Sequence, residues 1–289
     1  MTQASPHGAA LVRNLLLFKE LEDFLGELRG AAPILLKGAA LLATGSADPR
    51  RRVMQDIDLL VRPEELDGLM AALRKQGFEK LSGNASQFRK NGLDIDVHAE
   101  IWYLDERERA LFHLRAREAV IGEQTAKVPA PDDHLIYILA HAAIQHGELE
   151  PKWAEDVAVF LERHGAEIDF AGVWARLSQW GMTPAITWFL KRSSVKLPGA
   201  PPGEFFYDLL LDRLPLSNKG HFLQLLFLRS WRFRLKHLKK YLFPDSSFLI
   251  RRYDLRSDAQ VLLWRLLRPL LLLWNLVHSA FPIPSHGAR

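Results

Sequence analysis

The chain contains no cysteine, which excludes disulfide bonds, thiolate zinc sites and a cysteine nucleophile. No disulfide partner is therefore expected. The first residues also lack the basic stretch, apolar core and small-residue cleavage site of a secretory signal. We expect a cytoplasmic protein, with peripheral attachment to the inner membrane as a variant. The 289 residues carry no internal repeat and suffice for one large or two ordinary domains.

A long uninterrupted hydrophobic run is missing as well. Residues 261–280 are strongly apolar, but two arginines, a proline and a histidine interrupt them. The apolar part that remains, residues 270–274, is far too short to cross a bilayer. We expect a packed or interfacial helix here, and contact with a membrane surface stays open.

Positive charge is concentrated in one region. The net charge of the chain is +4, yet residues 228–256 contain nine Lys or Arg and two Asp, so the remainder is net negative. Within residues 229–240, basic side chains alternate with aromatic ones, a pattern that suits either RNA or an anionic membrane surface. The alternative is a helix with one solvated basic face. The basic residues are Arg229, Arg232, Arg234, Lys236, Lys239 and Lys240.

Two short segments, MQDIDLLV at 54–61 and LDIDVHAE at 93–100, carry acidic residues at alternate positions. In a strand, alternate side chains point to the same face, so each segment would be apolar on one face and acidic on the other. If the two strands are neighbours, the acids converge and repel, and a bound divalent cation compensates them. The alternative is a solvated polar face of an antiparallel sheet. The converging side chains would be Asp56, Asp58, Asp94, Asp96 and His98.

The surrounding chain has a mixed organisation. Helical spacing in 11–29, a short apolar run at 33–36 and an Asn91-Gly92 hairpin signal indicate a small unit of helices and strands. From Pro129 onward the periodicity is helical throughout. We place the boundary near 123–131, which gives an α/β domain over 1–125 and a helical domain over 126–289.

Several motifs together resemble the nucleotidyltransferases of the DNA polymerase β superfamily, and more narrowly their broad bacterial family of uncharacterised nucleotidyltransferases. Some motifs lie among the strands, and others lie in the helical half, so the resemblance covers most of the chain. The resemblance implies an α+β fold, in which a small mixed-sheet nucleotidyltransferase domain precedes an all-helical domain. The motifs are KGAAL at 37–41, RVMQDIDLLV at 52–61, IDVH at 95–98, PDDHLIYILAH at 131–141, WAEDVAVFL at 153–161 and YLFPD at 241–245.

The resemblance implies in-line transfer of a nucleotide from a nucleoside triphosphate to a hydroxyl, with two Mg²⁺ or Mn²⁺ ions. Two such ions stabilise the entering and leaving oxygens, and magnesium prefers carboxylate oxygens. Asp56 and Asp58 would hold both ions, and Asp96 would hold the ion that activates the acceptor hydroxyl. His98 could be a ligand, a partner of the ligands or a packed side chain, and we favour a partner because magnesium prefers oxygen. Asp94 is expected to be a hydrogen-bonding neighbour.

Three further residues are candidates for binding the triphosphate. Gly38, at a strand-to-helix turn, would let the backbone approach the phosphates, where a helix start offers free N–H groups. The wider superfamily has Gly-Ser at this turn, whereas Lys37-Gly38 supplies a cation in place of the hydroxyl. Arg52 is a second candidate phosphate ligand, because its loop leads into the acidic strand.

The sequence does not identify the acceptor, since sugars, antibiotics, peptides, proteins and RNA all offer hydroxyls. A toxin-like enzyme that adds nucleotides to the 3′ end of transfer RNA is a narrower version of the same chemistry. A non-catalytic adaptor that docks on a membrane or a protein through its C-terminal helices is a further alternative. The full set of acidic residues argues against that degenerate form.

Overall fold

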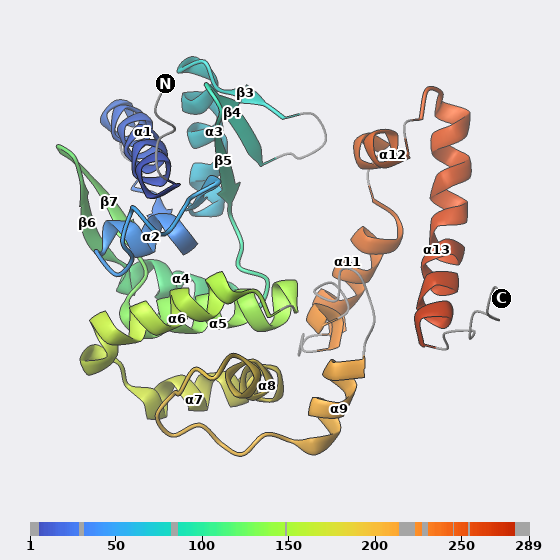
Figure 1. Cartoon of the computed structure of the whole chain (residues 1–289). Helices are drawn as coiled ribbons and strands as arrows, with labels where there is room; N and C mark the ends of the chain where they lie inside the picture. Colours follow the sequence, from blue (N-terminus) through green and yellow to red (C-terminus); the bar gives the residue numbers. More distant parts are fainter. Residues whose placement is uncertain are drawn as a thin grey trace. The chain divides into compact units, whose positions relative to one another are not determined.

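The computed structural model describes residues 6–28, 32–81, 86–147, 149–213, 223–226, 231–244, 246–253 and 255–280 (Figure 1). The chain divides into two compact units. The first comprises Met1–Leu139 and Glu150–Val173, and the second comprises Ala140–Leu149 and Trp174–Arg289.

The first unit is built on a seven-stranded mixed sheet with the order β3-β4-β5-β2-β1-β7-β6. The pairs β2–β5 and β1–β7 are parallel, and the other neighbours are antiparallel. The two acidic segments form the adjacent strands β2 and β5, as predicted, in the centre of the sheet. The strands are β1 (Ile34–Leu35), β2 (Asp56–Leu60), β3 (Glu79–Lys80), β4 (Gln87–Lys90), β5 (Leu93–His98), β6 (Arg117–Ile121) and β7 (Gln124–Val128).

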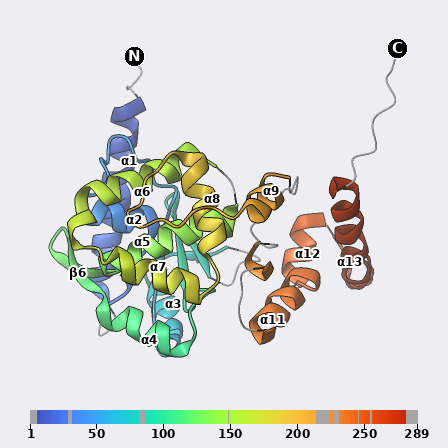
Figure 2. The same ribbon diagram turned by 90° about the horizontal axis from the view of Figure 1, so that it is seen from below.

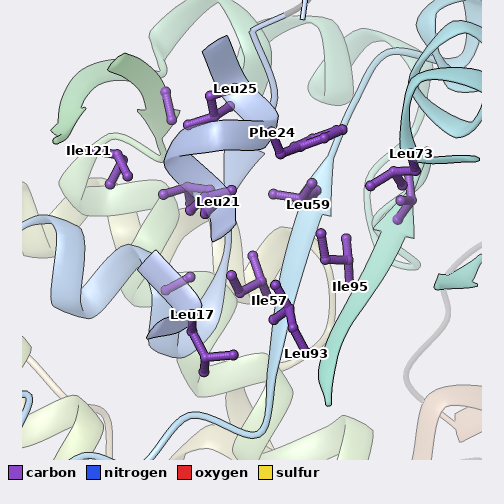
Figure 3. Close-up of a cluster of buried hydrophobic side chains, with 14 of the residues drawn as sticks. Leu17, Leu21, Phe24, Leu25, Ile57, Leu59, Leu73, Leu93, Ile95 and Ile121 are labelled. Carbon is purple, nitrogen blue, oxygen red and sulfur yellow. The ribbon is translucent and has the colours of Figure 1, made fainter. Parts of the chain in front are cut away.

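Helices α1 and α3 cover the apolar face of this sheet (Figure 3). Ile57 and Leu59 of β2 and Ile95 of β5 are fully buried against Leu21 and Phe24 of α1. Because side chains alternate along a strand, burial of these residues turns the acids of β2 and β5 to the opposite face. The helical segments are α1 (Pro6–Glu27), α2 (Lys37–Ala43), η1 (Pro63–Glu65), α3 (Leu66–Lys75), α4 (Glu106–Arg115), α5 (Pro131–Ala140), α6 (Pro151–His164) and η3 (Gly165–Glu167).

The described part of the second unit is helical. The boundary between the units falls within α7, and α13 contacts both α11 and α12 (the helices are labelled in Figures 1 and 2). Among the described residues, no helix is long and apolar enough to cross a membrane. The elements are η2 (His141–His146), α7 (Phe170–Gln179), α8 (Thr183–Ser193), α9 (Phe205–Arg213), α11 (Trp231–Leu242), α12 (Ser246–Tyr253) and α13 (Asp258–Ala280).

The predicted α+β fold class is confirmed, and so is the hairpin signal. Asn91 and Gly92 have φ angles of 52° and 80° and join β4 to β5 in a tight hairpin. The predicted boundary between a catalytic domain over 1–125 and a helical domain over 126–289 stays a prediction. Strand β7 runs across that boundary. Arg229 of the basic segment lies outside the described residues.

One helical segment departs from regular α-helical spacing. His141 and His146 are five residues apart, a spacing that separates side chains around an α-helix. The segment is instead a π-helix, whose wider turn returns to the same face after about five residues. The two imidazole rings are therefore in edge-to-face contact, with centroids 4.5 Å apart.

Candidate active site

The register of β2 and β5 sets the geometry of the acidic face. The parallel pairing places Asp58 beside Asp96, and Asp56 beside Asp94, on adjacent strands. Paired residues of neighbouring strands point to the same face of the sheet. The convergence predicted from the two segments is therefore present in the fold.

Asp58 lies at the centre of this face and is almost completely buried, with 2% of its surface exposed. Its Oδ1 accepts a hydrogen bond from Lys37 Nζ at 2.7 Å and lies 2.8 Å from His98 Nε2. Burial alone would raise the pKa of Asp58, but the His98 hydrogen bond and the Lys37 charge outweigh it and lower the pKa to about 2. The carboxyl group is therefore ionised at any physiological pH.

Asp96 and His98 complete a set of three potential ligands. His98 Nε2 lies 3.6 Å from Asp96 Oδ2, and one ligand atom from each of Asp58, Asp96 and His98 falls within 4.8 Å of the others. The other oxygen of Asp96, Oδ1, is buried and has no hydrogen-bond partner. A buried carboxylate oxygen without a partner is costly unless something binds it. The residues therefore fit a divalent cation.

The remaining two acids of the cluster differ from this set. Asp56 is exposed and is not part of the group of three. Partial burial of its carboxyl group, followed by the negative charge of Asp58, raises the pKa of Asp56. Asp94 makes a two-pronged ion pair with Arg89 of β4, at 2.5 and 2.6 Å, as expected for a hydrogen-bonding neighbour. Its oxygens are thus already bound within the sheet.

Lys37 and Gly38 are the first two residues of α2, at the turn that follows β1. Lys37 has a φ angle of 49°, in the left-handed region that a lysine rarely adopts. This conformation accompanies the ion pair of Lys37 Nζ with Asp58. Gly38 is buried, and a Cβ at this position would lie 3.4 Å from Met54 Cγ and 3.5 Å from Arg52 Nη2. The turn therefore packs against the loop that leads into β2.

The structure gives Arg52 a partner within the first unit. Its Nε and Nη2 donate to the two carboxylate oxygens of Asp156 on α6, at 2.7 and 2.9 Å. Burial raises the pKa of Asp156, and the Arg52 charge opposes that effect. The guanidinium lies next to Gly38, so this ion pair fixes the position of Arg52 beside the turn.

Sequence reasoning missed Tyr137. This residue on α5 is 5% exposed, and burial, followed by the negative charge of Asp58, raises its pKa well above the usual value. The charges of Asp96 and Asp56 act in the same direction, so the phenol stays protonated beside the acidic face. The only signal in the sequence is a tyrosine within the apolar stretch LIYILA at 135–140, which implies a partner for its hydroxyl.

A model of the uncharacterised nucleotidyltransferase family matches residues 4–192, which is well over half of the chain. The chain belongs to the uncharacterised nucleotidyltransferase family. The recognition from sequence motifs is confirmed, and the protein is a nucleotidyltransferase. The match covers β1 to β7 as well as α5 to α8, so it spans both the acidic strands and the first helices of the helical half.

Comparison with other proteins adds little beyond this match. A search among curated proteins found no match. The antibiotic-resistance factor ANT(2'')-Ia in solution is 17% identical, with a TM-score of 0.43 over 58% of this chain and 96% of that chain. The crystal structure of ANT(2'')-Ia in complex with adenylyl-2''-tobramycin is 16% identical, with a TM-score of 0.41 over 62% of this chain and 98% of that chain. An antigenic nucleotidyltransferase-like protein from Paracoccidioides brasiliensis is 18% identical, with a TM-score of 0.37 over 69% of this chain and 98% of that chain.

Proposed function

We propose that this nucleotidyltransferase is metal-dependent and transfers a nucleoside monophosphate from a nucleoside triphosphate to a hydroxyl of an acceptor. The observation that carries the proposal is the clustering of ligand atoms from Asp58, Asp96 and His98 within 4.8 Å. The buried Oδ1 of Asp96, which has no hydrogen-bond partner, supports it further. In this proposal residues 1–125 form the catalytic domain, and the helical residues 126–289 select the acceptor.

Asp58 and Asp96 would hold Mg²⁺ or Mn²⁺, and Asp56 would contribute a further oxygen from the exposed end of β2. When bound, two such ions supply positive charge that stabilises the entering and leaving oxygens of the phosphoryl group. His98 would orient Asp58 through the contact between Nε2 and Oδ1, a role that suits an imidazole beside oxygen ligands.

The other residues of the site would bind and orient the reactants. Lys37 would transfer its ammonium from Asp58 toward the triphosphate as the cation takes over that carboxylate. Gly38 would let the triphosphate approach the backbone of the turn, and Arg52 would present its guanidinium beside it. Asp96 would accept the proton from the acceptor hydroxyl as the hydroxyl oxygen attacks the α-phosphate, the bond to the β-phosphate breaks and pyrophosphate leaves.

The proposal predicts that labelled nucleotide is transferred to a component of a cell extract in the presence of Mg²⁺. Asp58→Asn and Asp96→Asn are expected to lower this transfer by more than about a hundredfold, because each removes a charged ligand. Asp94→Asn is the matched control, since Asp94 lies on β5 like Asp96 but is paired with Arg89. Transfer that survives both ligand substitutions would contradict the proposal.

Metal binding can be measured without a known acceptor. Titration of Mn²⁺ followed by electron paramagnetic resonance, with and without a non-hydrolysable triphosphate, reports occupancy directly. We expect Asp58→Asn to weaken Mn²⁺ binding and Asp94→Asn to leave it unchanged. Equal Mn²⁺ affinity in the wild-type protein and both variants would place the metal elsewhere.

A further inference from the structure

Helix α13 presents a broad apolar surface to solvent. Between Leu262 and Trp274, seven leucines and the tryptophan have 38–64% of their surface exposed. At about 100° per residue they sweep about half of the helix circumference, and no charged residue lies among them. We call the described side chains of this face the apolar arc. Exposed apolar surface on this scale marks an interaction site.

The opposite side of α13 holds the helix to its neighbours. Arg268 is 7% exposed, and its guanidinium donates to the carbonyl oxygen of Tyr241 on α11 and to the hydroxyl of Tyr253 on α12. Trp264 stacks on Tyr253 with ring centroids 3.9 Å apart. Arg265 donates to Ser246 Oγ on α12, so neither of the two arginines that interrupt the apolar sequence lies within the apolar arc.

The helices around α13 are strongly basic. Residues 231–257, which precede α13, contain eight Lys or Arg and two Asp. Arg234 and Lys239 of α11 are exposed, as is Arg256 just before α13. Exposed aromatic side chains accompany them, with Trp231 at 65% and Phe243 at 47%. A helix with an apolar face among basic and aromatic residues is the pattern of a protein that lies in the interface of an anionic membrane.

The charge and composition of these helices favour an anionic membrane over the other classes of partner. A second copy of the chain would bring two strongly positive surfaces together, and like charges oppose such an association. RNA requires phosphate ligands across the contact, whereas the apolar arc offers only leucine and tryptophan. No described helix can cross a membrane, so the helix would lie along the bilayer surface.

We propose that α11, α12 and α13 dock the protein on an anionic lipid bilayer, with the apolar arc inserted at the boundary between headgroups and acyl chains. Basic residues of α11 then contact the lipid phosphates. This interaction goes beyond nucleotidyl transfer and does not depend on it. It places the enzyme where an acceptor at the membrane surface would be within reach.

The test is flotation of the full-length protein with vesicles of phosphatidylcholine alone or mixed with phosphatidylglycerol. We expect binding to the mixed vesicles, and the variant Leu266→Glu/Leu270→Glu should lower it by at least about tenfold because two charged groups would enter the apolar boundary. Leu114→Glu is the matched control, since Leu114 is 77% exposed on α4 and should change nothing. Lys239→Gln should weaken binding to the anionic vesicles by about fivefold and leave binding to neutral vesicles unchanged.

The outcomes separate the competing partners. Failure of the wild-type protein to float with anionic vesicles overturns the proposal. So does equal binding by the wild type and Leu266→Glu/Leu270→Glu. A dimer that this variant converts to a monomer, with no vesicle binding, would assign the apolar arc to a second copy. Capture of single-stranded RNA in place of vesicles would assign the basic helices to nucleic acid.

Discussion

Lys37 combines a rare backbone conformation with a buried contact. A left-handed φ of 49° costs a non-glycine residue about 1–2 kcal/mol. Such strain persists at sites where the surrounding structure holds the residue in place. Here it accompanies an ammonium group 2.7 Å from the carboxylate of Asp58, at the predicted phosphate turn.

Two substitutions of Lys37 separate strain from charge. Lys37→Gly and Lys37→Ala both remove the ammonium, so both are expected to weaken triphosphate binding by about tenfold, as measured with a fluorescent nucleotide. Only the alanine variant retains the backbone strain, so the glycine variant should have a free energy of unfolding about 1 kcal/mol higher than the alanine variant. Unchanged triphosphate affinity in both variants would remove Lys37 from the phosphate site.

His134 makes the stability of the first unit depend on pH. It lies on α5 at 1% exposure, packs edge-to-face on Phe160, and has a buried Nε2 without a hydrogen-bond partner. Burial, with a smaller effect from the positive charge of His164, lowers the pKa of His134 to about 3. The imidazole therefore stays neutral in the folded protein while it can be protonated in the unfolded chain.

The sign of the effect follows from this difference. Below the unfolded pKa of about 6.5, the unfolded state binds a proton that the folded state does not, so stability falls by about 1.4 kcal/mol per pH unit down to about pH 3. Urea unfolding at pH 7, 6 and 5 should show this loss, and His134→Leu should flatten it. His7→Gln is the control, because His7 is exposed. An equally steep loss in His134→Leu would contradict the assignment.

At the scale of elements, the β4–β5 hairpin positions Asp96 and His98 and depends on one glycine. Gly92 has a φ of 80°, and the position that a Cβ would occupy is open, so Gly92→Ala should cost about 1 kcal/mol through backbone conformation alone. Gly68→Ala is the matched control, because Gly68 lies inside α3 with equally open surroundings and should gain about 0.5–1 kcal/mol. Thermal unfolding of both variants measures the difference. Equal changes in stability for Gly92→Ala and Gly68→Ala would show that the positive φ of Gly92 does not cause the loss.

Local signals in the sequence predicted the elements that carry the acids, because alternation and turn residues act over a few positions. The Asn91-Gly92 turn and the two acidic strands are of this kind. The hairpin of β6 and β7 was not predicted, since its turn is marked only by Gly122 and its strands alternate weakly. These two strands extend the sheet beyond β1.

Contacts between distant residues were beyond reach of the sequence. Arg52 and Asp156 are 104 positions apart, and the pairing of their side chains depends on the packing of α2 against α6. Arg52 was predicted as a phosphate ligand because its loop leads into the acidic strand, and nothing in the sequence identifies Asp156 as its partner. Tyr137 was missed for the same reason, since its proximity to the acids arises only when α5 is placed in the folded unit.

At the scale of the whole molecule, the hydrophobic clusters of the described residues differ in size. The cluster at the sheet contains twenty-two buried side chains, whereas the described residues of the cluster between α12 and α13 are Leu249, Leu255 and Val261. Regions with few buried apolar contacts open at a lower free energy than the core. Stability is therefore expected to be uneven along the chain.

Amide hydrogen exchange followed by mass spectrometry measures this unevenness. We expect the amides of β2 and β5 to exchange slowest and those of α13 to exchange much faster, because fewer buried contacts hold α13. Anionic vesicles should slow exchange in α13 and leave β2 and β5 unchanged. Protection of α13 equal to that of β2 without lipid would contradict this expectation.

The buried Oδ1 of Asp96, which no hydrogen bond satisfies, has a consequence for selection under the proposed function. A neutral side chain at this position would remove the desolvation penalty and, because the proposed cation ligand would be lost, give a more heat-resistant but inert protein. A screen that selects only for thermal tolerance would therefore enrich inactive variants at position 96.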